Sequence, residues 1–233
     1  MLDLNEKVIV AMDVETEEKA LALAQTLAGS GCWLKVGLEL YAAAGRGIVH
    51  GFKELGFPIF LDLKLHDIPT TVERAVRSLV GIGADMLDVH CAGGYEMMAL
   101  AAEAAHSAGQ GAGNVPKVLG VTVLTSMDEQ GLAELGVIRP VAEQVVSLAL
   151  LAKQAGLDGV VASAREAAML RQACGDDFLI ITPGIRPAWS ETNDQVRVVT
   201  PQQALASGST YLVVGRPVTR AVDPRQALER LWE

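Results

Sequence analysis

Eight short apolar segments recur along the chain, and stretches with the composition of helices alternate with them, although a long polar loop follows the seventh. The segments are 8–12, 33–37, a strand that opens at Phe60, 84–90, 117–124, 157–161, 178–182 and 211–215. Their spacing of roughly 22–35 residues is that of βαβ units, in which a helix connects two parallel strands. The alternation therefore predicts an α/β protein whose parallel strands are covered by helices.

Two α/β architectures suit this pattern, an open doubly wound sheet and a closed (β/α)8 barrel. The dinucleotide fingerprint of the open sheet is missing, because Gly45 and Gly47 have the wrong spacing and follow a helix-like run. No polar linker divides the 233 residues, and barrels of this length commonly form one domain. We therefore predict a single-domain (β/α)8 TIM barrel over residues 1–233.

The composition limits the classes of partner and the compartment. Hydrophobic residues make up 50% of the chain and aromatic residues 4%, which suits a core of Ala, Val, Leu and Ile. The net charge of −9 argues against a nucleic-acid surface, which needs clustered Lys and Arg. No segment approaches the about 18 apolar residues of a membrane span, and the first residues do not resemble a signal peptide. The three cysteines form no CxxC pair, so we expect a soluble cytoplasmic protein with reduced thiols.

Residues 60–69 combine a strand with an unusual set of charges. Side chains alternate between the two faces of a strand, so Asp62 and Lys64 share one face while the leucines around them take the other. In a barrel both faces are covered, and burying charges costs several kcal/mol per ion. Asp67 adds a second acid in the turn that follows. The alternative interpretation is a structural ion pair on an exposed strand.

In a (β/α)8 barrel the active site lies at the C-terminal ends of the strands. The polar residues at or near those ends are Asp13, Lys35, Asp62, Lys64, Asp67, His90, Thr125, Arg186 and Arg216. Alternating acids and ammonium groups at one mouth lower the cost of burying one another, and they keep a lysine protonated. The set therefore predicts a catalytic site in which a lysine acts as an acid.

Two later segments predict an anion site. Gly215 and Arg216 stand just before Pro217, at a strand-to-helix junction where backbone N–H groups favour a phosphate. Arg186 belongs to a long polar connection that also contains Gln195, and an arginine there can clamp a phosphate as a lid closes. The alternatives are an ordinary turn and a flexible surface loop. The four histidines show no metal-ligand spacing, so we expect no metal site.

Six motifs, in this order along the chain, closely resemble those of the orotidine 5′-phosphate decarboxylase family. They are VAMDV (10–14), LKVG (34–37), FLDLKLHDIPTTV (60–72), VTVLTS (121–126), TPGIR (182–186) and VVGRPVT (213–219). The resemblance extends from about Val8 to Asp223. It implies a barrel homodimer that converts orotidine 5′-monophosphate (OMP) to uridine 5′-monophosphate (UMP) and CO2 in pyrimidine synthesis, with no metal or organic cofactor.

The resemblance also implies roles around the reacting atoms. Lys64 would donate a proton to C6 of the pyrimidine, and Asp62 would face the substrate carboxylate. Lys35 would hold Asp62 in place and hydrogen-bond the ribose. Asp13 would also bind the ribose.

The remaining matched residues would bind the rest of the substrate. Thr125 or its neighbour Ser126 would contact the pyrimidine. Asp67 and Thr71 would cross the dimer interface to the ribose of the other subunit. The residues that would hold the phosphate are Arg186, Gln195, Gly215 and Arg216.

Two rival functions remain. Metal-using phosphosugar decarboxylases or isomerases, similar to 3-keto-L-gulonate 6-phosphate decarboxylase, share the Asp-x-Lys-x-x-Asp element and carry a metal-binding glutamate on the second strand. Lys35 stands in that segment here, and its ammonium group would repel a divalent ion. A non-catalytic sensor of a phosphorylated metabolite would have little reason to keep Lys64 beside two acids.

Overall fold

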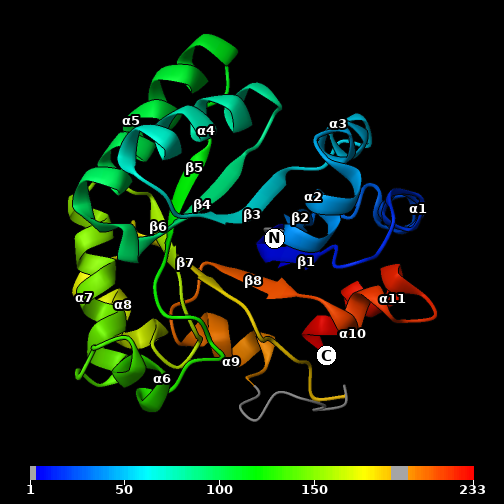
Figure 1. Cartoon of the computed structure of the whole chain (residues 1–233). Coiled ribbons are helices and arrows are strands. Elements are labelled where there is room, and N and C mark those ends of the chain that lie inside the picture. Colours follow the sequence, from blue (N-terminus) through cyan, green and yellow to red (C-terminus); the bar gives the residue numbers. More distant parts are fainter. Residues whose placement is uncertain (1–3, 190–198) are drawn as a thin grey trace.

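Eight parallel strands form a closed barrel in which neighbours follow chain order and β8 pairs with β1 (Figure 1). The computed structural model describes residues 4–189 and 199–233. The strands are β1 (Val8–Ala11), β2 (Trp33–Gly37), β3 (Ile59–Leu65), β4 (Met86–His90), β5 (Lys117–Val121), β6 (Gly159–Val161), β7 (Leu179–Thr182) and β8 (Tyr211–Val214). The predicted (β/α)8 TIM barrel is confirmed.

Helices connect the strands and surround the barrel (Figure 1). The α-helices are α1 (Glu17–Leu27), α2 (Leu38–Ala44), α3 (Gly47–Glu54), α4 (Pro69–Gly81), α5 (Gly94–Ala112), α6 (Glu129–Glu134), α7 (Val141–Gln154), α8 (Ala167–Cys174), α9 (Pro201–Ala206), α10 (Arg216–Thr219) and α11 (Pro224–Glu229). Short 3-10 helices are η1 (Leu4–Lys7), η2 (Cys91–Gly93) and η3 (Arg230–Trp232). The long α5 packs against both α4 and α7.

Hydrophobic side chains form two separate layers. The layer inside the barrel consists of Ile9, Ala11, Phe60, Met86, Leu119, Ile181 and Val213. A larger layer fills the space between the strands and the helices. Because successive strand residues point to opposite faces, Phe60 belongs to the inner layer and Leu61 to the outer one. Asp62 continues the inward series, as the alternation in the sequence predicts.

Polar side chains fasten the N-terminal end of the barrel. They stand immediately before β4, β6 and β8, and each accepts a backbone N–H from the start of the preceding strand. The pairs are Asp85 with Ile59 at 2.7 Å, Asp158 with Val118 at 2.9 Å and Thr210 with Ile180 at 3.1 Å. Lys53 and Lys117 add ion pairs to the two aspartates. Strand-end donors are thus satisfied at the end opposite the predicted site.

Strand β5 is shorter than the apolar segment 117–124 suggests. It ends at Val121, and Thr122 then donates both its backbone N–H and its hydroxyl to the carbonyl oxygen of Val161 in the neighbouring β6, at 3.3 and 3.0 Å. The residues that follow leave the sheet, and Val123 and Leu124 line the mouth of the barrel. The apolar run therefore continues into a wall of the cavity described next.

Candidate active site

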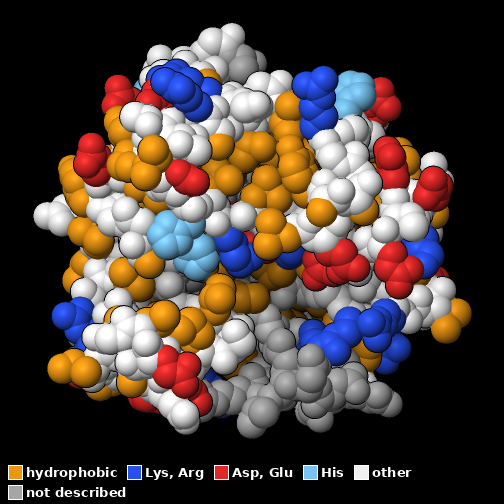
Figure 2. Space-filling view, in the orientation of Figure 1, with side chains coloured by type: hydrophobic (Ala, Val, Ile, Leu, Met, Phe, Trp, Pro, Cys, Tyr) orange, Lys and Arg blue, Asp and Glu red, His pale blue; other side chains and the backbone are white. Residues whose placement is uncertain are grey.

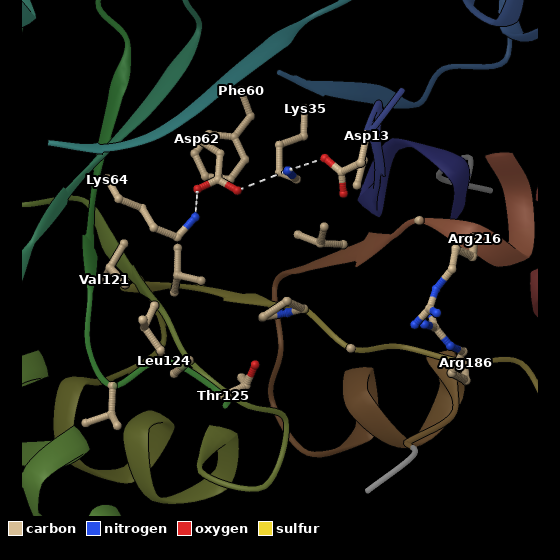
Figure 3. Close-up of a pocket in the computed structure, with 18 residues that line it drawn as sticks. Asp13, Lys35, Phe60, Asp62, Lys64, Val121, Leu124, Thr125, Arg186 and Arg216 are labelled. Carbon is tan, nitrogen blue, oxygen red and sulfur yellow. Dashed lines mark hydrogen bonds and ion pairs between the residues drawn. The ribbon is translucent and has the colours of Figure 1, made fainter. Parts of the chain in front are cut away.

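A cavity of about 340 Å³ opens at the C-terminal ends of the strands. Figure 2 shows Lys and Arg side chains close to the hollow in the middle of this face, and Figure 3 shows the residues inside it. The predicted site residues that line the cavity are Asp13, Lys35, Asp62, Lys64, Thr125, Arg186, Gly215 and Arg216. Charges that lie far apart in the sequence are therefore brought into one site.

Four charged side chains alternate in sign along one wall of the cavity, in the order Asp13, Lys35, Asp62 and Lys64 (Figure 3). Nζ of Lys35 lies 3.2 Å from Oδ1 of Asp13 and 3.1 Å from Oδ2 of Asp62. Nζ of Lys64 donates to the other carboxylate oxygen of Asp62. The row forms because β1, β2 and β3 are neighbours in the barrel. Asp62 is consequently held between two ammonium groups.

Burial and pairing set the charge states in this row. The side chains of Lys35 and Asp62 are only 9% and 13% exposed. Burial acts to raise the pKa of Asp62, but the ammonium group of Lys35 and further contacts outweigh it and lower that pKa to about 2. Burial acts to lower the pKa of Lys35, but the carboxylates of Asp62 and Asp13 outweigh it and raise that pKa. Both side chains are therefore ionised at neutral pH.

Lys64 has a left-handed backbone, with φ at 51°, and among the described residues no other non-glycine residue has a positive φ. Such a conformation costs about 1–3 kcal/mol and is found chiefly at functional sites. It coincides with an irregularity in the sheet, since Leu61 pairs with Leu87 whereas Leu65 pairs with Val89. The extra residues of β3 bulge out of the ladder, and bulges redirect side chains.

Asp88 of β4 is a buried carboxyl group beside this row and was not among the predicted site residues. Asp88 is 1% exposed, and its Oδ1 accepts the backbone N–H of Lys64 at 2.8 Å. Burial and then the neighbouring carboxylate of Asp62 raise the pKa of Asp88 well above its usual range. The strand period could have revealed it, because Asp88 lies two residues after the inward-facing Met86 and two before His90.

Two guanidinium groups line the side of the cavity opposite Lys64 (Figure 3). Arg186 follows β7 and is 6% exposed, and its backbone N–H donates to the carbonyl of Val199 at 3.1 Å. Gly215 follows β8, and Arg216 begins the short helix α10. Two arginines in one cavity wall suit a phosphate, which guanidinium groups bind through paired charge-assisted hydrogen bonds.

The wall between the charged row and the arginines is mostly apolar, and it includes Phe60, Val121, Leu124 and Val161. Thr125 contributes a hydroxyl to the same cavity. Its neighbour Ser126 lines only an adjoining cavity that extends toward α7. Thr125 is thus better placed than Ser126 to contact a ligand.

Other predicted residues do not line the cavity. Asp67 and Thr71 are exposed near the start of α4. His90 lies with its ring centroid 5.4 Å from that of His66 and is also absent from the cavity wall. Gln195 lies outside the described residues.

The cavity has two chemically different ends, with Lys64 at one and Arg186 and Arg216 at the other. An anionic ligand held at the arginines would extend along the apolar wall to Lys64, which can donate a proton from a largely buried position. In the part of the chain that the structure describes, no group of three or more His, Cys, Asp or Glu side chains is arranged to hold a metal ion. No helix in that part is long and apolar enough to cross a membrane.

The chain is similar to one group of known proteins over nearly its whole length. The model of the family described as orotidine 5′-phosphate decarboxylase / HUMPS family matches residues 6–231. Proteins named orotidine 5′-phosphate decarboxylase from Alkalilimnicola ehrlichii and Nitrosococcus oceani are 51% and 48% identical over 225 residues, which cover 97% of this chain and 94% and 95% of theirs. A crystal structure of orotidine 5′-phosphate decarboxylase from Lactobacillus acidophilus is 40% identical, covers 97% of this chain and 96% of its own, and has a TM-score of 0.86.

Proposed function

The chain belongs to the orotidine 5′-phosphate decarboxylase / HUMPS family, and we propose that it converts OMP to UMP and CO2, a step of pyrimidine biosynthesis, as one catalytic domain without a metal or organic cofactor. The observation that carries the proposal is the alternating charged row, with Asp62 between Lys35 and Lys64. Arg186 and Arg216 across the cavity supply the phosphate end that such a substrate needs.

The proposed reaction transfers one proton and needs no external electrons. The bond between C6 and the carboxylate carbon breaks, CO2 leaves, and the electron pair remains on C6. The ammonium group of Lys64 protonates that carbon, and the resulting amine regains a proton from water. Asp62 orients the ammonium group of Lys64 through a hydrogen bond, and Lys35 fixes Asp62 from its other side.

Magnitudes decide which interaction contributes most. Repulsion between Asp62 and a substrate carboxylate about 4 Å away is worth about 4 kcal/mol at an effective dielectric constant near 20. Enzymes typically remove about 8–23 kcal/mol of barrier. Repulsion in the bound substrate is therefore a minor contribution. The larger one is the stabilisation of the developing carbanion by Lys64 in a preorganised site from which water is excluded.

The purified protein is expected to deplete OMP and form UMP in equal amounts, and to do so unchanged after treatment with EDTA. The ammonium group of Lys35 lies between two carboxylates of the cavity and would repel a divalent ion that approached them. The measurement is the decay of OMP absorbance with and without the chelator. Loss of activity in EDTA that Mg²⁺ restores would favour the metal-using rival, and absence of turnover would favour a sensor.

We further propose that the active unit is a homodimer in which Asp67 and Thr71 complete the partner's site. Both residues are exposed and outside the cavity of their own chain. Large exposed hydrophobic side chains follow three neighbouring strands at the same rim, namely Leu38, Ile68 and Tyr95, which are 61%, 65% and 53% exposed. Exposed hydrophobic side chains at one rim are the kind of surface that a protein interface covers. Figure 2 shows hydrophobic side chains gathered between the α3 and α4 regions of this face.

Mixing two inactive variants tests the shared site. Lys64→Ala and Asp67→Asn each inactivate both sites of their own homodimer. A dimer that contains one chain of each has one site with a native Lys64 and a native Asp67 from the partner. Random exchange is therefore expected to restore about a quarter of wild-type activity. If Asp67 acts within its own chain, co-expressed or co-refolded mixtures remain inactive.

A cytoplasmic location is also part of the proposal. The substrate is an anionic nucleotide, and Cys32, Cys91 and Cys174 are all free and buried. Unpaired thiols are typical of reducing compartments. Recovery of the protein outside the cytoplasm in cell fractionation would contradict this assignment.

A further inference from the structure

We propose that Asp88 is a positioning residue, a neutral carboxylic acid that holds the backbone of Lys64 and donates a hydrogen bond to Asp62. The inference rests on the proposed decarboxylation for its kinetic consequences, but not for the state of the carboxyl group itself. Asp88 lies on β4 beneath the charged row and does not line the cavity. It therefore acts through its two neighbours rather than on the substrate.

The backbone contact replaces a missing part of the sheet. Between the pairs Leu61–Leu87 and Leu65–Val89, β3 contains more residues than β4. The bulged residues cannot all bond to backbone groups of β4, and the N–H of Lys64 instead donates to Oδ1 of Asp88 at 2.8 Å. This bond fixes the left-handed conformation of Lys64, in which φ is 51°. The direction of the lysine side chain consequently depends on Asp88.

The side-chain contact identifies the protonated partner. The carboxyl groups of Asp88 and Asp62 lie within hydrogen-bonding reach of each other. Two buried carboxyl groups this close share a proton, because both cannot ionise together. Asp62 has ammonium groups on two sides, so the proton resides on Asp88. Oδ2 of Asp88 is fully buried and receives no hydrogen bond from any described residue, which is the environment expected of the oxygen that carries the proton.

A neutral Asp88 leaves a single negative charge between the two lysines. An ionised Asp88 would place a second anion behind Asp62 and would add to the repulsion of the substrate carboxylate. It would also compete with Asp62 for the ammonium group of Lys64. A neutral Asp88 avoids both effects and still orients Asp62. Its role is therefore to position Asp62 and Lys64, and not to react with the substrate.

Two substitutions of opposite character test the proposal. Asp88→Leu removes both hydrogen bonds and is expected to lower kcat by about 10²-fold with KM changed by less than about threefold, because small misalignment of a reacting group costs rate while the phosphate contacts persist. Asp88→Asn supplies a carbonyl oxygen for the Lys64 N–H and an amide donor for Asp62. It is therefore expected to restore most of the kcat that leucine loses. A loss in Asp88→Asn as large as in Asp88→Leu would mean that a negative charge is required, and an unchanged kcat in Asp88→Leu would remove the positioning role.

The protonation state of Asp88 can be measured by infrared spectroscopy without any substrate. The infrared spectrum of the wild-type protein at neutral pH should contain a band from one buried protonated carboxyl group, and that band should be missing from Asp88→Asn. An identical spectrum in both proteins overturns the proposal even if leucine at this position prevents folding. A band lost in Asp88→Asn, from a protein without OMP turnover, would instead show that the proposed function fails while the neutral acid stands.

Asp85→Asn provides the matched control. Asp85 lies three residues earlier in the chain, at the opposite end of the barrel, where it pairs with Lys53 and accepts the N–H of Ile59. Its substitution is expected to lower the Tm without changing kcat. An equal loss of kcat in Asp85→Asn and Asp88→Leu would attribute both effects to general destabilisation.

Discussion

Replacement of Lys64 with alanine is expected to lower kcat for OMP decarboxylation by about 10⁴-fold or more. The change removes the proposed proton donor for C6, and with it the positive charge proposed to stabilise the developing carbanion. Asp62 remains paired with Lys35 at 3.1 Å, so the site keeps its other charges. Single-turnover measurement of UMP formation at saturating OMP would determine the effect on the chemical step.

Two further variants separate chemistry from folding. Lys64→Gly accommodates the positive φ without strain, and it should be as inactive as Lys64→Ala although its backbone is better suited. Lys117→Ala removes a lysine at the N-terminal end of β5, where the side chain pairs with Asp158, and should retain wild-type kcat. Substantial turnover in both Lys64 variants would assign the proton to another donor.

Arg216→Ala should lower kcat/KM for OMP by about 10²–10³-fold, although Arg216 is proposed to bind the phosphate and not the reacting atoms. Arg216 lies on the side of the cavity opposite Lys64, and its proposed partner is the phosphate. Binding energy at a remote group orients the substrate and favours closure of the site. The effect should therefore appear in kcat as well as in KM.

A substrate without the phosphate isolates this contribution. With orotidine, the nucleoside, wild type and Arg216→Ala are expected to have the same kcat/KM, because the interaction partner is absent from both. Arg220→Ala is the matched control, since Arg220 is exposed at the end of α10 and outside the cavity. Equal losses with OMP and with orotidine would indicate that Arg216 supports the shape of the site instead.

The barrel was predictable from the sequence because the two signals that specify it are local. Apolar segments at regular spacing identified the strands, and alternation within β3 placed Asp62 on the inner face. The rule that barrel sites lie at strand ends then selected the polar residues after each strand. Most of them line a single cavity, because a closed barrel brings all strand ends to one mouth.

The rest depends on contacts between distant segments. The bulge of β3 and the left-handed Lys64 arise from pairing with β4, which no pattern within residues 60–69 reveals. Asp88 is a single carboxylate in an apolar strand, and its role depends on the backbone of Lys64 in the neighbouring β3, a contact that no pattern within residues 84–90 reveals. Asp67 is exposed and lies outside the cavity of its own chain, so a single chain does not test the role in a partner's site that the resemblance implies.

The polar side chains at the N-terminal end of the barrel have a consequence for which segments of this protein can change in evolution. Asp85, Asp158 and Thr210 each tie the start of one strand to the chain just ahead of the next, and all three are remote from the cavity. Contacts at the N-terminal rim thus hold the strands in place, whereas the residues of the cavity lie at the C-terminal rim. Segments around the mouth can be lengthened, shortened or exchanged without loosening the strands beneath them, so new substrate preferences are most readily introduced there.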